Sequence, residues 1–334
     1  MRVQKSARLL AVFGVLVTAL AAAGQVTAAV PYTVSTFATG VATVYFQPDS
    51  IALLDGHIFI GYGNGVAPDG SDGKSSTIVE YKMNGDVVTT YSVVGHNDGL
   101  RVNPQTKQLW AMQNEDANPN LVIIDTTKGT QTVYTFGPTP HGGGYDDISF
   151  RGSDVFLSAS NPANNPNFAP AVVRATISGS VLNVSEALNA SAIATDIPTD
   201  TPLTLNLQDP DSMIFNPFGD LVLDSQSDAE LIIVHHLGYT DQSVFHLGLT
   251  LNGAAAQVDD TIFATSTHGT ILVSDRDSGA AGVVYAISKN IFSPAAAYTA
   301  TPTSVGNLDL DTGVISNVVT GMVSPHGMAF ISGQ

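Results

Sequence analysis

Acidic side chains recur at regular intervals along this chain, each just before a short apolar segment. Five aspartates and one histidine occupy these positions: Asp49, Asp98, Asp147, Asp211, Asp260 and His326. The aspartates are separated by 49, 49, 64 and 49 residues. Carboxylates that a fold brings together repel one another, and a bound divalent cation relieves that repulsion. Carboxylate oxygens suit calcium, magnesium or manganese, so the pattern predicts a metal site.

Three of the eight histidines lie at or just before the same positions. Three imidazoles around an open position form one ligand set of catalytic zinc, so zinc is a further candidate metal. We expect His96 to join the five aspartates as a metal ligand. His141 and His326 are the expected catalytic histidines, and Tyr145, which follows a run of three glycines after His141, is the expected proton donor.

Each of these residues also has a structural interpretation. An aspartate at the start of a strand often accepts hydrogen bonds from its own turn, and a single histidine is common in loops. Arg101 and Arg151 follow two of the aspartates and could pair with them or bind an anionic substrate. A module that binds a ligand or a protein without catalysis is therefore the alternative to a metal-dependent enzyme.

The aspartates open units that contain further short apolar segments. In the second unit, for example, residues 108–111, 121–124 and 132–136 follow the opening segment. Four short strands in each unit of this length are typical of a propeller blade. We predict an all-β chain that forms a single β-propeller of six four-stranded antiparallel blades, with five or seven blades as alternatives.

The closure of the ring is the least regular part of the pattern. Residues 270–273 are expected to form the second strand of the fifth blade. The chain stops just after the sixth opening strand, at residues 328–331. Residues 32–37 and 43–46 are therefore expected to complete the last blade, and residues 305–319 to supply outer strands. Because opening strands line the channel of a propeller, the candidate residues should converge at one end of its axis.

The first 29 residues resemble a cleaved signal peptide, which leaves residues 30–334 as the propeller domain. Three basic residues precede an apolar run of 15 residues, and small residues follow at the expected cleavage site. The sequence thus predicts a periplasmic or secreted monomer without a membrane anchor after cleavage. The chain has no cysteine and a formal net charge of −17. This acidity disfavours nucleic acid as a partner, so a small-molecule substrate or ligand is expected.

Three of the opening motifs resemble those of the superfamily of SMP-30/gluconolactonase, NHL-repeat and strictosidine-synthase-like propellers. They are Asn97–Leu100, Pro210–Met213 and Pro325–Phe330. The resemblance implies a hydrolase, such as a lactonase, with one divalent metal ion held at the axis. Asn97 or Asp98 and Asp211 match the metal ligands of that branch, whereas its first-blade glutamate is not matched, because Pro48-Asp49-Ser50 stands there instead. The neighbouring amidating-lyase and streptogramin-lyase-like propellers use axial histidines, which His96, His141 and His326 resemble.

Overall fold

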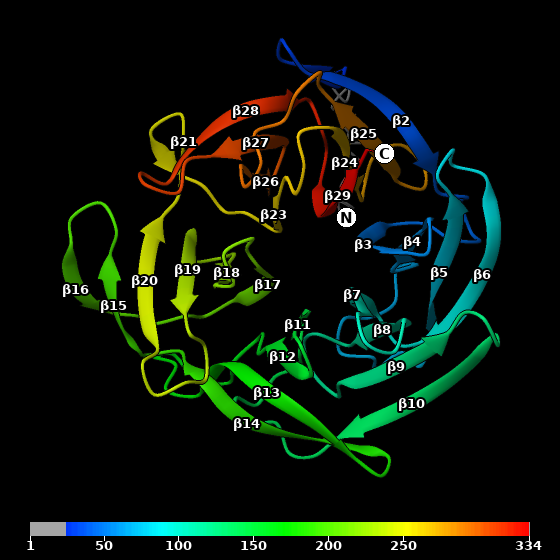
Figure 1. Ribbon diagram of the computed structural model, residues 1–334. Coiled ribbons are helices and arrows are strands. Elements are labelled where there is room, and N and C mark those ends of the chain that lie inside the picture. Colours follow the sequence, from blue (N-terminus) through cyan, green and yellow to red (C-terminus); the bar gives the residue numbers. More distant parts are fainter. Residues whose placement is uncertain (1–24, 334) are drawn as a thin grey trace, which may run out of the picture.

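The computed structural model describes residues 25–333, which form six four-stranded blades around a central axis (Figure 1). These residues contain no helix, and so none long and apolar enough to cross a membrane. The predicted all-β propeller is confirmed. The predicted signal segment lies outside the described residues, except for residues 25–29.

The first three blades follow the chain in order, each from an inner strand to an outer one. Blade 1 holds β3 (Pro48–Leu54), β4 (His57–Tyr62), β5 (Ser75–Lys82) and β6 (Val87–Val94). Blade 2 holds β7 (Asn97–Asn103), β8 (Gln108–Gln113), β9 (Asn120–Asp125) and β10 (Thr130–Phe136). Blade 3 holds β11 (Ile148–Arg151), β12 (Asp154–Ser158), β13 (Pro170–Ser178) and β14 (Val181–Asn189).

Blade 4 carries an insertion at its outer edge. It holds β17 (Pro210–Phe215), β18 (Leu221–Ser225), β19 (Glu230–His235) and β20 (Ser243–Gly248). The hairpin of β15 (Ile193–Asp196) and β16 (Thr201–Thr204) extends this sheet, because β15 pairs in parallel with β20. The insertion accounts for the longer spacing between the third and fourth aspartates.

The last two blades exchange strands, which differs from the predicted order. Blade 5 consists of β23 (Thr261–Phe263), β26 (Ala297–Thr301), β27 (Ser304–Leu308) and β28 (Val314–Thr320), with β21 (Thr250–Leu251), β22 (Ala254–Ala255) and β1 (Thr27–Ala28) at its edge. Blade 6 consists of β29 (Pro325–Ser332), β24 (Gly269–Asp275), β25 (Val283–Ser288) and β2 (Thr33–Thr39). The chain thus leaves blade 5 after β23, forms β24 and β25 in blade 6, and then returns.

The expectation that residues 270–273 belong to the fifth blade is therefore wrong. In β24, Ile271 and Val273 pack in the apolar cluster between blades 5 and 6, while Leu272 packs in the cluster between blades 6 and 1. Because β24 pairs with β25 on one side and with β29 on the other, it is a central strand of blade 6. Residues 305–319 are outer strands, as predicted, but of blade 5. The N-terminal β2 completes blade 6, whereas residues 43–46 form no strand beyond an isolated bridge.

Apolar clusters fill the interfaces between neighbouring blades. Between blades 1 and 2, for example, Phe59, Ile78, Leu100 and Val122 are buried against one another. Because each blade is covered on both faces, its middle strands consist of nearly continuous apolar residues. This packing fixes the inner strands around the channel, and thus the side chains at its two ends.

Candidate functional site

Six side chains from the six blades meet at the end of the channel where the inner strands begin. Asp49, Asp98, Asp211 and His326 lie there, as predicted from the repeat. The remaining two places are held by Asp146 and Asp259, which directly precede two of the predicted residues. We call Asp49, Asp98, Asp146, Asp211, Asp259 and His326 the acidic ring.

The structure therefore moves Asp147 and Asp260 out of the ring to a deeper layer of the channel. Asp147 Oδ2 accepts hydrogen bonds from Arg101 Nη2 at 2.5 Å and from the backbone N–H of Met213 at 3.0 Å. Asp260 Oδ2 likewise accepts the backbone N–H of Met328 at 2.6 Å. Each carboxylate joins its blade to the next one, which is a structural role other than the capping of its own turn.

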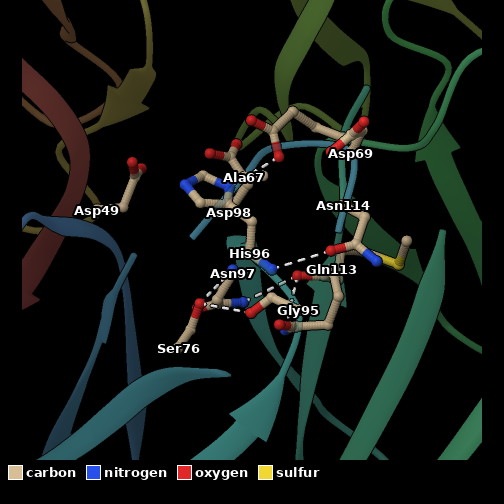
Figure 2. Close-up of polar contacts among 12 residues, drawn as sticks. Asp49, Ala67, Asp69, Ser76, Gly95, His96, Asn97, Asp98, Gln113 and Asn114 are labelled. Atoms are coloured by element: carbon tan, nitrogen blue, oxygen red, sulfur yellow. Dashed lines mark hydrogen bonds and ion pairs between the residues drawn. The ribbon is translucent and has the colours of Figure 1, made fainter. Parts of the chain in front are cut away.

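Three acidic residues at this end of the channel face a basic side chain. Glu115 Oε2 lies 2.8 Å from His96 Nδ1. Asp49 Oδ2 lies 3.5 Å from Arg276 Nη1, and Asp259 Oδ1 lies 3.7 Å from His326 Nε2. Figure 2 shows His96 beside Asp98, with Asp49 on a separate strand facing them, and the backbone N–H of His96 donates to Asn114 Oδ1 at 2.9 Å.

The other three acidic residues, Asp98, Asp146 and Asp211, form a cluster that we call the carboxylate triad. One oxygen of each lies within 4.8 Å of the others. None of the three forms a salt bridge with a residue that the structure describes. Their position between blades 2, 3 and 4 follows from the inner strands, because Asp98 and Asp211 are the second residues of β7 and β17 and Asp146 lies two residues before β11.

Burial and mutual repulsion perturb the titration of the triad. Burial and the charge of Asp211 raise the pKa of Asp146 well above its usual value. Burial and the charge of Asp259 raise the pKa of Asp211 in the same way. Burial also opposes ionisation of Asp98, but a hydrogen bond with Asp146 and the charge of His96 outweigh it, so the pKa of Asp98 is lowered. The basic side chains near the triad thus do not balance the negative charge that its three carboxylates would carry when ionised.

His141 and Tyr145 lie away from the ring in a buried loop. His141 Nε2 is 2.6 Å from the carbonyl oxygen of Gly144, and its ring contacts that of Tyr145 at 5.0 Å. Burial lowers the pKa of His141 and raises that of Tyr145. Gly144 is required here, because a Cβ atom would lie 2.2 Å from the carbonyl oxygen of Asn114. The loop therefore supports the segment that carries Glu115.

Sequence reasoning missed Glu115 and Arg276. Glu115 follows β8, and its only signal was its position in a polar loop at the same end of blade 2 as His96. Arg276 follows β24, and it reaches the ring because that strand lies in blade 6 instead of blade 5. Its guanidinium is 3.4 Å from both His96 Nε2 and His326 Nε2.

A polar cavity of about 340 Å³ adjoins the ring between blades 4, 5 and 6. Asp259 and His326 line it, together with amide and hydroxyl side chains from Gln226, Gln257, Thr301 and Ser324. A small polar molecule in this cavity would contact the ring from one side.

No protein-family model and no curated protein matches the chain. Solved structures show the same fold. A protein of unknown function from Bacteroides thetaiotaomicron aligns with a TM-score of 0.51 and 11% identity, over 89% of this chain and 69% of that chain. Virginiamycin B lyase from Staphylococcus aureus aligns with a TM-score of 0.48 and 10% identity, over 89% and 88%.

The periplasmic gluconolactonase of Pseudomonas aeruginosa aligns with a TM-score of 0.47 and 11% identity, over 85% of this chain and 88% of that chain. At these identities the likeness concerns the fold alone, so function must be argued from the residues of this chain.

Proposed function

We propose that this chain is a metal-dependent hydrolase or lyase that acts on a small molecule at the acidic end of its channel. One observation carries the proposal: Glu115, Asp49 and Asp259 each form a salt bridge with a basic side chain, whereas Asp98, Asp146 and Asp211 cluster without one among the described residues. A divalent cation bound by the triad would supply the missing positive charge.

The donor set of the triad fits a hard cation. It offers carboxylate oxygens alone, which calcium, magnesium and manganese prefer, whereas zinc favours histidine or cysteine donors. The ligands of the proposal are thus Asp98, Asp146 and Asp211, in place of the larger set predicted from sequence. A metal ion bound there would act as a Lewis acid toward a substrate carbonyl or a water molecule.

Two histidines are placed to move a proton beside the triad. His96 is oriented by Glu115 through Nδ1, and its Nε2 lies 3.4 Å from Arg276 Nη2. Burial lowers the pKa of His96, but the hydrogen bond and charge of Glu115 outweigh burial and raise it overall. His326 is flanked by Asp259 and Asp49, and it also lines the polar cavity. These two histidines, and not His141 or Tyr145, are the proton-transfer groups of the proposal.

Metal binding tests the proposal directly. Protein purified without chelator would be analysed for bound metal, and calcium and manganese would be titrated into chelator-treated protein by calorimetry. We expect one strong site in the wild type, its loss in Asp211→Asn, and its retention in the exposed control Asp311→Asn. Absence of a strong site in the wild type would reject the proposal.

Activity is then tested with panels of lactones and of cyclic ester and amide substrates, in calcium or manganese and in chelator. Turnover that requires metal and fails in His96→Gln would support the enzyme. A protein that binds metal and ligands but converts none of them would instead be the non-catalytic binding module.

We also propose that the protein is exported and is periplasmic or secreted, acting as a monomer. The acidic, cysteine-free composition and the basic and apolar start of the chain support this proposal. Sequencing the N-terminus of protein recovered from the periplasm and the medium of a bacterial host would test it. An uncleaved chain in the cytoplasm would contradict it.

A further inference from the structure

The end of the channel opposite the acidic ring has a second repeated pattern. The fourth residue after each member of the acidic ring is large and apolar. These residues are Leu53, Val102, Phe150, Phe215, Phe263 and Phe330, which we call the apolar ring. All six line one cavity of about 370 Å³. The channel is thus acidic where the inner strands begin and apolar toward their ends.

The cavity has room because small side chains lie one residue before the apolar ring in three blades. Ala52, Ser149 and Ala329 occupy these positions and also line the cavity. Cavities of about 300 to 1,000 Å³ with mostly apolar walls and a few polar groups are typical of small-molecule sites. The half-buried rings of Phe150, Phe215 and Phe330 would lose contact with water when such a molecule binds.

Arg101 is the one charged side chain among the residues that line this cavity. Its only hydrogen-bond partner among the described residues is Asp147, which Nη2 contacts at 2.5 Å. A guanidinium has five N–H donors in a fixed plane, so most of them are free. The side chain is 19% exposed although it lies inside the channel, because it faces the cavity.

We propose that this cavity binds an apolar small molecule that ends in an oxygen acceptor, which Arg101 hydrogen-bonds. The apolar ring would enclose the body of the ligand, and the free N–H groups of Arg101 would fix its polar end. Because Asp147 balances the charge of Arg101, burial of the apolar body provides most of the affinity and the hydrogen bond provides orientation. The site is separate from the carboxylate triad and does not depend on the proposed function.

Two fluorescent probes test the site on the full protein. Anilinonaphthalene sulfonate has an apolar body with an oxygen acceptor, and phenylnaphthylamine has a similar body without one. We expect the wild type to bind one molecule of each probe, equally well in calcium and in chelator. Absence of saturable binding of both probes would overturn the proposal.

Variants locate the probe. Leu53→Glu places a charge in the apolar ring and should weaken both probes about tenfold, because a carboxylate there is costly to desolvate. Val133→Glu makes the same change on the exposed outer strand β10 and should leave binding unchanged. Both variants should unfold cooperatively near the temperature of the wild type. Wild-type affinity in a folded Leu53→Glu protein would show that the probes bind elsewhere, and the proposal would fail.

The role of Arg101 is tested by Arg101→Lys, which keeps the positive charge beside Asp147 but loses the planar set of donors. We expect the sulfonate probe to bind about fivefold more weakly, since lysine offers a single point of contact, while the neutral probe keeps its affinity. Equal affinities for both probes in the wild type and in Arg101→Lys would show that Arg101 does not recognise the ligand.

Discussion

Asp147 Oδ2 accepts the backbone N–H of Met213 at 3.0 Å, across 66 residues of sequence. The same oxygen accepts a hydrogen bond from Arg101, so one buried carboxylate joins the inner strands of blades 2, 3 and 4. Asp260 repeats the contact with Met328, between blades 5 and 6. These two aspartates hold the ring of inner strands together below the acidic ring.

Replacing Asp147 should therefore destabilise the whole propeller. Asp147→Ala leaves the Arg101 charge and the Met213 N–H without their partner, and the loss in free energy of unfolding should be about 3 kcal/mol. Urea denaturation measures it. As a control, Asp154→Ala removes a carboxylate that pairs with Arg151 and Arg174 near the surface, where a loss below about 1 kcal/mol is expected. Equal losses in the free energy of unfolding for the two variants would show that Asp147 does not join the blades.

The effect of Asp211→Asn on stability should change sign when metal is bound. In chelator the variant should be more stable than the wild type, by about 1 kcal/mol, because it removes a buried like charge. In saturating calcium or manganese the wild type should be the more stable protein, by about 2 kcal/mol or more, because only it gains from ligand binding. Thermal unfolding under both conditions measures the crossover. If the variant were less stable than the wild type in chelator, the proposed repulsion between Asp211 and the neighbouring carboxylates would be wrong.

Stability without metal should also depend on pH in a defined direction. The pKa values of Asp146 and Asp211 are raised in the folded protein, so the folded state holds protons that the unfolded state releases. Stability in chelator should therefore fall as pH rises above the unfolded value of about 4 toward the raised pKa values. Bound metal should remove most of this dependence. Urea midpoints measured across that range, with and without calcium, provide the comparison.

His246 should act as a pH-dependent clamp on the inserted hairpin of blade 4. Its Nδ1 lies 2.9 Å from Asp196 on β15, and its Nε2 lies 2.9 Å from Glu230 on β19. The hydrogen bond with Glu230 is the largest cause of a raised pKa of His246. The stabilisation is complete below the unfolded value of about 6.5 and is lost as pH rises through the raised pKa.

His246→Gln should accordingly destabilise the protein by about 1 kcal/mol near pH 6 and by much less near pH 9. Urea denaturation at the two pH values gives the difference. His235→Gln is the matched control, since His235 is 46% exposed and lies 3.6 Å from one carboxylate, that of Asp220. An identical pH dependence of the two variants would exclude the clamp.

Engineered disulfides can test the strand exchange between blades 5 and 6. Thr270 on β24 lies directly opposite Ile331 on β29. Because the chain lacks cysteine, Thr270→Cys combined with Ile331→Cys should form one disulfide in the folded protein, detectable by mass spectrometry without reductant. The control pair, Thr270→Cys with Thr261→Cys on β23, should stay reduced. A disulfide in the control pair alone would show that β24 lies beside β23 in blade 5, and the strand exchange would be wrong.

The repeat in the sequence was sufficient to predict the propeller and much of the acidic ring. Asp49, Asp98, Asp211 and His326 converge as predicted, because each is the second residue of the inner strand of its blade. The apolar segments that follow them specify strands, and stacking of repeated units around an axis aligns equivalent positions. These features are local, so the order of residues along the chain contains them.

Only the tertiary structure decided which of two adjacent aspartates enters the ring. Asp146 and Asp147 are adjacent, but neighbouring side chains on an extended strand point in opposite directions, so an offset of one residue reverses their roles. Inner strands in blades 1, 2 and 4 have register irregularities at this point, which blur the alignment. Asp147 thus became a tie between blades, while Asp146 joined the triad.

Arg276 depended even more on the tertiary structure. It lies 227 residues from its partner Asp49, and it reaches the ring because β24 packs between β25 and β29 in blade 6. The pairing of β24 with β25 and β29 decides its blade, and no periodicity in the chain reveals that pairing. The sequence by itself determined the blades and the acidic end of the channel. Tertiary packing decided which carboxylates form a salt bridge with a base and which three cluster without one among the described residues.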